Sequence, residues 1–312
     1  MRVLVLGGSG MLGSTVVDFL ARDRGLRVGA TVRNRQMLGA GHRLLPEVNW
    51  HALDVDADSL RELPSFLDDY DWIINAIGVI KPFISDDRPD EVRRAIQVNA
   101  LFPYSLAHRA EDVGVRVLQI ATDCVFSGSE GGYTEEAAHH PLDVYGMTKS
   151  LGEVDSKNVF HLRCSIIGPE VKNHVSLLDW FLKQAPGSKL TGFTNHLWNG
   201  VTTLHFAKIC CGIIKHNLEV PCLQHIVPAK EITKAEMLDY FSTCYRRDDI
   251  KIVHGVSSSP IDRTLRTNNP VINRLLWEVG GYMKPPSVPD MIEDLHAFDF
   301  RLGSMDSTLL QG

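Results

Sequence analysis

Several features that would assign the chain to particular protein classes are missing from its sequence. The six cysteines form no Cys-x-x-Cys pair, and no cysteine–histidine cluster has zinc-site spacing, so we predict no metal site. We expect reduced and mostly buried thiols, as in a reducing cytoplasm. The apolar stretch 206–214 is too short to cross a bilayer and is interrupted by Lys208. Met1 leads directly into a strand-like run without signal-peptide anatomy, which also favours a cytoplasmic protein.

A large excess of charge is missing as well. Charged residues make up 22% of the 312 residues and the net charge is −6, which argues against a broad surface for nucleic acid or anionic membranes. Hydrophobic residues make up 44%, enough for a packed core, and the length fits one large domain or two coupled ones. The composition therefore predicts a soluble globular protein.

Short apolar runs alternate with amphipathic segments through the first half of the chain. Strands buried on both faces read as continuous apolar runs, and their alternation with helices is typical of a parallel sheet covered on both sides. We therefore predict an α/β fold of the Rossmann type, a doubly wound parallel sheet. The expected strands are 2–6, 26–32, 48–53, 72–77, 115–121 and 159–164, and the expected helices are 11–22, about 58–67, 91–113 (with a bend or break near Pro103) and 144–155.

The alternation loosens after residue 168. Segment 174–184 is amphipathic, 187–200 is rich in Gly and Asn, and 203–216 and 223–227 read as a helix and a strand that return to the sheet. We expect a dinucleotide-binding domain formed by 1–168 with 201–228, and a smaller C-terminal substrate-binding lobe. That lobe would comprise 169–200 and 229–312, with loops at 255–270 and 284–290 and a disordered polar tail after Leu302.

A glycine-rich turn, GGSGMLG at 7–13, joins the first expected strand to the first helix. Glycines permit a tight turn, and the missing side chains let the backbone and the helix N-terminus approach a pyrophosphate. A glycine-rich turn alone is weak, but the strand before it and the helix after it are the context that a dinucleotide site requires. The candidate cofactor contacts here are Gly7, Gly10, Met11, Leu12 and Gly13.

The end of the second expected strand indicates which cofactor is bound. Proteins that bind NAD usually place a carboxylate there for the ribose 2′-hydroxyl, whereas this chain has Arg33 and Arg35. Because guanidinium groups suit a 2′-phosphate, we predict NADPH (or NADP+) and consider NADH the less favoured cofactor. The competing interpretation is that both arginines are solvated surface charges.

Two further strand ends contribute candidate cofactor contacts. Asp54 could accept a hydrogen bond from an adenine amino group, and the small residues of NAIG let a cofactor lie against the backbone. Ordinary capping and turn chemistry is the alternative at both places. The candidates are Asp54, Val55, Asn75, Ala76, Ile77 and Gly78.

Tyr145 and Lys149 lie four residues apart, which puts both side chains on one face of a helix. A nearby ammonium favours the phenolate and should lower the pKa of Tyr145, and Lys149 could also hold the ribose hydroxyls of the nicotinamide. Thr122, at the end of the fifth expected strand, could hydrogen-bond the same substrate oxygen. Asn99 could hold a water or a backbone group that positions Lys149, or could be an ordinary polar helix residue. These residues predict a reduction in which hydride is transferred to a ketone carbon while Tyr145 protonates the oxygen.

At these residues the chain resembles the extended short-chain dehydrogenase/reductases, and more narrowly the dTDP-4-dehydrorhamnose reductase branch. The resemblance covers roughly the first 170 residues, and the family's Thr, Tyr and Lys fall on Thr122, Tyr145 and Lys149. The matching segments are GGSGMLG (7–13), NAIG (75–78), VNA (98–100), TDCVFSG (122–128), YTEE (133–136), Pro141, YGMTKSLGE (145–153) and LRCSIIGPE (162–170).

The resemblance implies a nucleotide-linked 4-keto-6-deoxy sugar as substrate and a nicotinamide pocket at 163–168 that includes Cys164. Asp123, Cys124 and Val125 become candidate substrate contacts. Where the branch usually has Tyr and Asp, this chain has Cys124 and Ser127. Related sugar-nucleotide dehydratases have a Glu at the position of Cys124, so the resemblance disfavours dehydration.

Candidate contacts in the C-terminal lobe are less certain from sequence. Arg263 and Arg266 suit a diphosphate, and the segment 194–200, which contains Asn195 and Trp198, offers hydrogen-bonding groups and an aromatic plane. Surface charge and a structural Gly/Asn loop are the competing interpretations.

Three functions remain open from the sequence. The first is an NADPH-dependent oxidoreductase that reduces a nucleotide-linked 4-keto sugar in deoxysugar biosynthesis, acting on a small molecule, with a homodimer as a possible assembly. The second is a 4-epimerase with retained NAD, which Arg33 and Arg35 disfavour. The third is a non-catalytic binding subunit, as in the regulatory subunit of methionine adenosyltransferase, which shares the fold.

Overall fold

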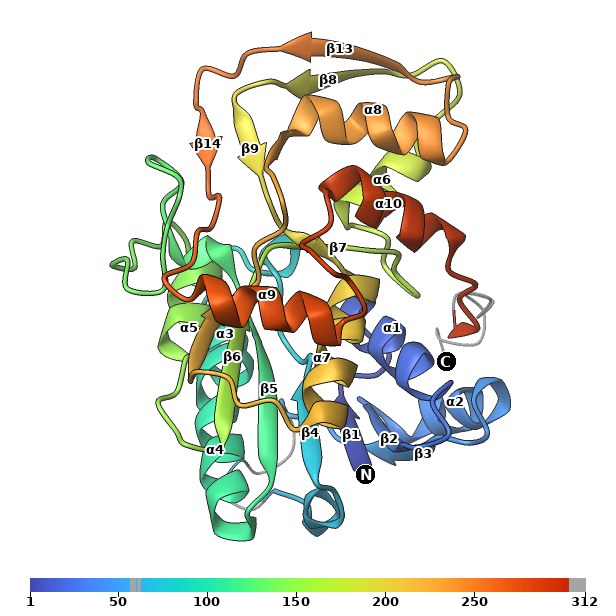
Figure 1. Cartoon of the computed structure of the whole chain (residues 1–312), viewed down its shortest axis with the longest axis vertical. Coiled ribbons are helices and arrows are strands. Elements are labelled where there is room, and N and C mark those ends of the chain that lie inside the picture. Colours follow the sequence, from blue (N-terminus) through green and yellow to red (C-terminus); the bar gives the residue numbers. More distant parts are fainter. Residues whose placement is uncertain (57–59, 61–62, 303–312) are drawn as a thin grey trace.

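A parallel β-sheet forms the centre of the protein in the computed structural model, which describes residues 1–56, 60 and 63–302 (Figure 1). The strand order of this seven-stranded sheet is β11-β6-β5-β4-β1-β2-β3, and every neighbouring pair is parallel. The strands are β1 (Arg2–Leu6), β2 (Arg27–Val32), β3 (Asn49–Ala52), β4 (Trp72–Asn75), β5 (Arg116–Ala121), β6 (Val159–Arg163) and β11 (Leu223–His225).

The strand order confirms the predicted Rossmann-type fold. The chain winds outward from β1 in both directions, so the order reverses between β1 and β4, where crevices at the carboxyl ends of the strands bind ligands in this class. Alternate residues of β1 enter two separate cores. Val3 and Val5 pack with Val16 of α1 (Met11–Leu20), whereas Leu4 and Leu6 pack on the opposite face with Phe102.

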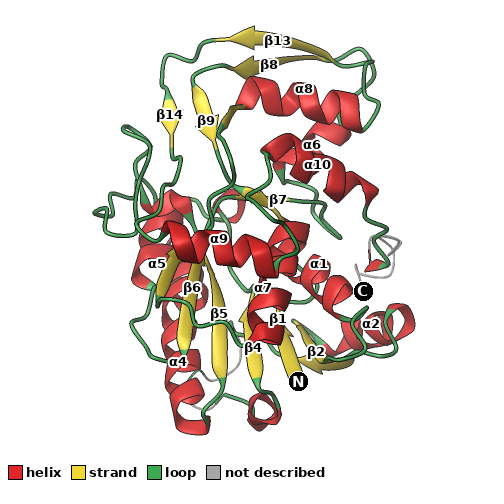
Figure 2. Cartoon of the chain, in the orientation of Figure 1, coloured by secondary structure: helices red, strands yellow, loops and turns green. Residues whose placement is uncertain are grey.

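Helices cover both faces of the sheet. On one face, α1 packs against α7 (Thr203–His216), which in turn contacts α9 (Pro270–Val279). The other face carries α3 (Pro89–Ile96), α4 (Phe102–Val113) and α5 (Val144–Leu151). Figure 2 shows these two helical layers around the strands. The remaining helical segments of this half are α2 (Leu38–Leu44) and the short turns η1 (Arg35–Met37), η2 (Ser65–Asp69), η3 (Lys81–Phe83) and η5 (Asp123–Val125).

The long helix expected at 91–113 is present with one irregular turn. A π-helical turn, η4 (Gln97–Leu101), joins α3 to α4, and Pro103 lies in the first turn of α4. Proline lacks an N–H group and displaces the preceding backbone, so the i→i−4 ladder is interrupted where the wider turn forms. Part of the helix expected at about 58–67, and the polar tail after Leu302, lie outside the described residues.

A second group of elements lies above the carboxyl ends of the sheet strands (Figure 1). Two of its strands, β8 and β9, fall within 187–200, a segment whose sequence showed only that it is rich in Gly and Asn. Their partners β13, β12 and β14 come from distant parts of the chain. The proposed division into two domains stays a prediction. The elements are β7 (Ile166–Ile167), α6 (Leu177–Leu182), β8 (Lys189–Phe193), β9 (His196–Trp198), β10 (Val201–Thr202), β12 (Ile232–Thr233), α8 (Lys234–Cys244), β13 (Lys251–Gly255), β14 (Ile261–Asp262) and α10 (Val288–Ala297).

All six cysteines are free, and Cys164, Cys210 and Cys211 are buried. Among the described residues, no helix is long and apolar enough to cross a membrane.

The end of the described chain is held on α1 by a buried carboxylate. The carboxylate of Asp18 is fully buried and accepts from the backbone N–H of Arg301 at 2.6 Å and from its guanidinium Nε at 2.8 Å. The Arg22 guanidinium pairs with the same carboxylate at 3.0 Å. Asp18 therefore joins residues that are more than 280 positions apart.

We predict that Asp18→Asn lowers the free energy of unfolding by about 2–4 kcal/mol, because it leaves two guanidinium groups and buried N–H groups without their charged acceptor. The matched control is Asp71→Asn, which removes the exposed ion pair between Arg2 and Asp71 and should cost less than about 1 kcal/mol. Urea unfolding of both variants measures the difference. Equal losses would contradict the anchoring role of Asp18.

Candidate functional site

The turn after β1 is tightly packed against itself. Gly7 adopts a φ of +82°, and a Cβ on Gly13 would lie 2.1 Å from the Gly7 carbonyl oxygen. The N–H groups of Gly7 and Gly8 donate to Thr31, to its Oγ1 at 2.9 Å and its carbonyl oxygen at 2.7 Å. Gly10 caps α1 without a side-chain hydrogen bond, so the first N–H groups of the helix face outward without a side-chain acceptor. This cradle suits a pyrophosphate.

The cationic groups expected at the cofactor's ribose are exposed at the end of β2. Arg33 and Arg35 are both exposed. Lys172 comes after β7 and lies near Arg33. The pKa of its ammonium is lowered mainly by burial, and to a smaller extent by the positive charge of Arg33. Sequence reasoning missed Lys172. A phosphate group placed between these two cations would relieve their repulsion.

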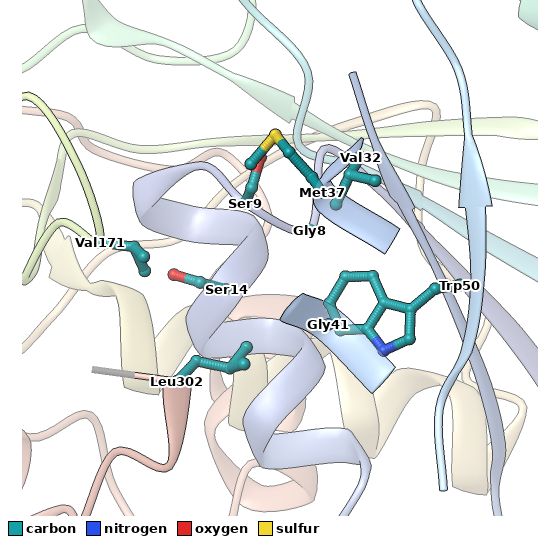
Figure 3. Close-up of a pocket in the computed structure, with 9 residues that line it drawn as sticks. All are labelled: Gly8, Ser9, Ser14, Val32, Met37, Gly41, Trp50, Val171 and Leu302. Atoms are coloured by element: carbon teal, nitrogen blue, oxygen red, sulfur yellow. The ribbon is translucent and has the colours of Figure 1, made fainter. Parts of the chain in front are cut away.

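A small cavity lies beside the start of α1 (Figure 3). Its volume is about 10 Å³, room for roughly one water, so an adenine ring does not fit inside it. The side chains of Trp50 and Leu302 point toward this space. The lining residues are Gly8, Ser9, Ser14, Val32, Met37, Gly41, Trp50, Val171 and Leu302.

The residues after β3 and β4 are held by their own hydrogen bonds. The Asn75 amide donates to Gln119 at 2.7 Å and accepts from the N–H of Ile77 at 3.1 Å, and Gly7 packs on Ala76 and Ile77. Asp54 accepts from the N–H of Asp56 at 3.1 Å. Val55, Leu12 and Cys164 are buried, whereas Met11 and Gly78 are partly exposed or exposed. The structure thus brings the NAIG segment directly against the glycine turn.

Thr122, Tyr145 and Lys149 meet at the carboxyl end of β5. Thr122 follows that strand and its Oγ1 accepts from the N–H of Cys124 at 3.2 Å. The Tyr145 hydroxyl lies close enough to Thr122 for this side chain to oppose the rise in the tyrosine's pKa. The Lys149 ammonium donates to the carbonyl oxygen of Ile120, also in β5, at 3.0 Å. The sequence spacing predicted that these three residues would be neighbours.

The pKa of the Tyr145 phenol differs from the sequence expectation. We expected a nearby ammonium to lower this pKa, but burial raises it, with a smaller contribution from Cys124. Burial disfavours the phenolate, and the Lys149 ammonium is directed to the Ile120 carbonyl. Burial also lowers the pKa of Lys149 to about 8, against the opposing charge of Glu153.

Asn99 joins the segment after β4 to helix α5. Its Oδ1 accepts from the N–H of Val79 and its Nδ2 donates to the Val79 carbonyl oxygen, both at 2.9 Å. Nδ2 also reaches the hydroxyl of Thr148, the residue before Lys149, at 3.2 Å. Asn99 therefore contacts a backbone group and the helix that carries Lys149.

A buried guanidinium holds the far end of α5. Arg163, at the end of β6, is fully buried and pairs with Glu153, and it donates to Nε2 of His225 at 2.9 Å and of His139 at 2.8 Å. Both imidazoles must therefore be neutral with the proton on Nδ1, where His225 meets a carbonyl oxygen and His139 the hydroxyl of Ser150. Burial is the main cause that lowers the pKa of both histidines.

The candidate substrate residues have different environments. Asp123 is buried, and burial raises the pKa of its carboxyl group while Arg263 and Lys234 oppose the shift. Burial raises the pKa of the Cys124 thiol to about 12. Val125 is fully buried among Phe126 and its neighbours, so its side chain is unavailable to a ligand.

Three candidate substrate-binding residues of the C-terminal elements make different contacts. Trp198 donates its indole N–H to Ser165 at 2.8 Å, and the ammonium of Lys234 lies 5.4 Å from its ring centroid. The Asn195 amide is occupied, because it both donates to and accepts from the backbone of Ser257. Arg266 is exposed and lies against Gly132.

Sequence reasoning missed Lys234, although a signal was present. Thr233 and Glu236 form a capping box, so Lys234 occupies the first turn of α8. A cation is unfavourable at a helix N-terminus, where the macrodipole is positive. A lysine in that place needs a compensating anion, and the Asp123 carboxylate is one.

The parallel sheet, the strand order and the glycine cradle define an α/β protein of the dinucleotide-binding Rossmann class. The chain belongs to the family described as RmlD substrate binding domain, which matches residues 1–174. It is thus a member of the family of reductase-like proteins that the sequence resemblance indicated.

Curated relatives include both a subunit of another enzyme and a reductase. The beta subunit of methionine adenosyltransferase 2 from Xenopus tropicalis is 24% identical over 87% of this chain and 80% of its own length. A dTDP-4-dehydrorhamnose reductase from Streptomyces griseus is 33% identical over 49% of this chain and 43% of its own length. The chain thus spans less than half the length of that reductase. It also spans 41% of the length of the beta subunit from Rattus norvegicus.

Solved structures share the fold at low sequence identity. A dTDP-4-dehydrorhamnose reductase from Bacillus anthracis, in complex with NADP, has a TM-score of 0.66 and 17% identity over 94% of this chain and 98% of its own. A UDP-glucuronic acid 4-epimerase from Bacillus cereus, with UDP-glucuronic acid and NAD, has a TM-score of 0.72 and 15% identity over 95% of this chain and 98% of its own.

We predict that Gly13→Ala lowers the free energy of unfolding by about 2–3 kcal/mol, because the new methyl group would overlap the Gly7 carbonyl. Gly10→Ala is the matched control in the same turn. Its Cβ would lie 3.4 Å from the same oxygen at an ordinary φ of −84°, and its effect should stay below about 1 kcal/mol. Thermal melting without added cofactor measures both. Similar melting temperatures would show that the turn is looser than described.

Proposed function

We propose that the protein is an NADPH-dependent reductase of a nucleotide-linked 4-keto-6-deoxy sugar. One observation carries the proposal: the Tyr145 hydroxyl lies near Thr122 at the end of β5, and Lys149 is hydrogen-bonded to Ile120 of the same strand. This group lies at the same edge of the sheet as the glycine cradle, two strands away from β1. The six free cysteines also fit a reducing cytoplasm, where we place the protein.

The residues present fit the cofactor. The glycine cradle and the open start of α1 would hold the pyrophosphate, Arg33 with Arg35 and Lys172 the 2′-phosphate, and Lys149 the ribose hydroxyls. When bound, NADPH supplies the hydride that is transferred to the keto carbon.

The protein's own part in the reaction is to hold and protonate the substrate oxygen. Thr122 and Tyr145 would both contact the C4 oxygen, and the phenol of Tyr145 would donate its proton as the carbonyl becomes an alcohol. The raised pKa of Tyr145 keeps this proton on the phenol at neutral pH, which suits reduction. Lys149 then supplies positive charge near the phenolate that remains.

The surroundings of Cys124 disfavour dehydration. Elimination needs a base at this position, and the pKa of the Cys124 thiol is raised to about 12 by burial and by Asp123. A thiol that keeps its proton at neutral pH cannot remove one from a sugar carbon. This environment supports reduction as the chemistry of the site.

A non-catalytic binding role is the second candidate. The match to the beta subunit from Xenopus tropicalis spans 87% of this chain, more than the match to the reductase from Streptomyces griseus. The closeness of Thr122 and Tyr145 favours reduction over this role. A panel of dTDP-, UDP- and GDP-linked 4-keto-6-deoxy sugars with NADPH separates the two, since a binding subunit would turn over none of them.

We predict that Tyr145→Phe lowers kcat by about 10²- to 10⁴-fold while NADPH binding is nearly unchanged, because only the proton donor is lost. Tyr104→Phe is the control, since that tyrosine is exposed on α4. Steady-state kinetics and cofactor titration by fluorescence measure the two effects. Near-normal turnover by Tyr145→Phe would refute the assigned role.

We predict opposite pH trends for activity and stability above pH 8. The pKa of Lys149 is lowered to about 8, so its ammonium is present below that pH and is lost as the pH rises. Activity that needs the ammonium should therefore fall above about pH 8. In the unfolded chain the lysine keeps its proton to a pH near 10.4, so its contribution to stability rises between the two values.

Rate profiles and urea unfolding from pH 7 to 10 measure both trends, with Lys149→Met as the reference. That variant should lose part of the gain in stability. A rate that stays constant up to pH 10 would contradict the required charge.

A further inference from the structure

Lys234 lies at the point where the small sheet β12-β9-β14 faces the residues after β5. Its strand β12 pairs with β9 so that Ile232 is opposite Trp198, and Lys234 follows two residues later as the first residue of α8. Arg263 comes directly after β14, the strand on the other side of β9. In this register Arg263 is level with Trp198, whereas the backbone of Lys234 continues toward the His196 end of β9, and its ammonium reaches back to 5.4 Å from the Trp198 ring centroid.

Electrostatic contacts locate this end of the sheet relative to Thr122. The charges of Arg263 and Lys234 both act on the Asp123 carboxylate, and that of Asp123 acts on Lys234 in turn. Asp123 Oδ1 lies 3.3 Å from Thr122 Oγ1. The ammonium of Lys234 therefore faces the residue next to the one that would hold the keto oxygen.

The donors of this ammonium are available. Within the described part of the chain, Lys234 makes no hydrogen bond or ion pair, and its side chain is half-buried over the Trp198 ring. Arg263, by contrast, donates its Nε to the carbonyl oxygen of Phe126 at 3.0 Å. A half-buried ammonium at a helix N-terminus is costly unless it binds something, and the nearby Asp123 carboxylate offsets part of its charge without accepting from any of its three donors.

An ammonium and a carboxylate that face the same space are complementary to a hydroxyl group. The ammonium can only donate and the carboxylate can only accept, while a hydroxyl does both. A sugar held with its keto oxygen on Thr122 and Tyr145 would place the hydroxyl of the adjacent ring carbon near Asp123.

We propose that Lys234 is a substrate-binding residue that, together with Asp123, recognises the hydroxyl group on C3 of the sugar ring, next to the C4 ketone. The inference rests on the proposed reductase function and adds a specificity determinant to it. Substrates without this hydroxyl leave the ammonium and the carboxylate unsatisfied, so the enzyme discriminates against them.

Lys234→Met tests the inference, because methionine keeps most of the side-chain length and removes the donors. With dTDP-4-keto-6-deoxyglucose, or the UDP or GDP form that the wild type reduces, KM should rise about 10- to 100-fold, and the affinity for NADPH should not change. Lys234→Arg should restore part of the affinity. The control is Lys230→Met, an exposed lysine of the preceding segment, which should behave like the wild type.

The 3-deoxy form of the same substrate separates hydroxyl recognition from other roles. The wild type should bind the 3-deoxy substrate more weakly than the natural one, by a factor similar to the rise in KM caused by Lys234→Met. The variant should bind both substrates about equally, because the mutation and the missing hydroxyl remove the same contact. This comparison in the wild type also tests the proposal if Lys234→Met fails to fold.

Three results would overturn the inference. One is an unchanged KM of Lys234→Met, and another is full discrimination against the 3-deoxy substrate by the variant. The third is an equal loss of affinity for the free nucleoside diphosphate, which would assign Lys234 to the phosphates. A wild type that reduces none of the 4-keto sugars would instead refute the proposed function, and the inference with it.

Discussion

The buried guanidinium of Arg163 fixes the helix on which the candidate catalytic residues depend. It pairs with Glu153, which lies one turn beyond Lys149, and it is held in place by neutral His139 and His225. A buried ion pair of this kind is rarely a large net gain in stability, but losing one partner leaves an isolated charge in the interior. The constraint is therefore geometric: β6 and α5 keep a single relative position, and Tyr145 and Lys149 keep theirs above β5.

Much of the fold could be predicted from local sequence. Strands such as β1 are apolar after their first residue because both faces are buried there, and the glycine turn is short, so its flanking elements were foreseeable. The strands β8 and β9 could not be predicted in the same way. The segment 187–200 that contains them is rich in glycine and asparagine, and they are stabilised by pairing with β13, β12 and β14. The bond between Asp18 and Arg301 was also hidden, because no local pattern links residues so far apart.

The candidate site divides in a similar way. The spacing of Tyr145 and Lys149 put them on one helical face, and Thr122 ends the adjoining strand, so their proximity followed from secondary structure. The pKa of Tyr145 did not follow from secondary structure, because it depends on burial, which residue spacing does not reveal. Asn195 illustrates the same limit: its residue type suits a sugar, yet tertiary contacts commit its amide to Ser257.

Two buried lysines carry positive charge on the two sides of the candidate site. Lys149 and Lys234 both have pKa values lowered to about 8, and in each case burial is the main cause. Burying a cation disfavours the folded state, so these lysines reduce the stability of the chain at neutral pH. An oxyanion, a phosphate or a hydroxyl oxygen beside either ammonium would reverse that effect and raise its pKa. Ligand binding should therefore stabilise the folded chain through these two ammonium groups. Unfavourably buried charges of this kind are expected at functional sites.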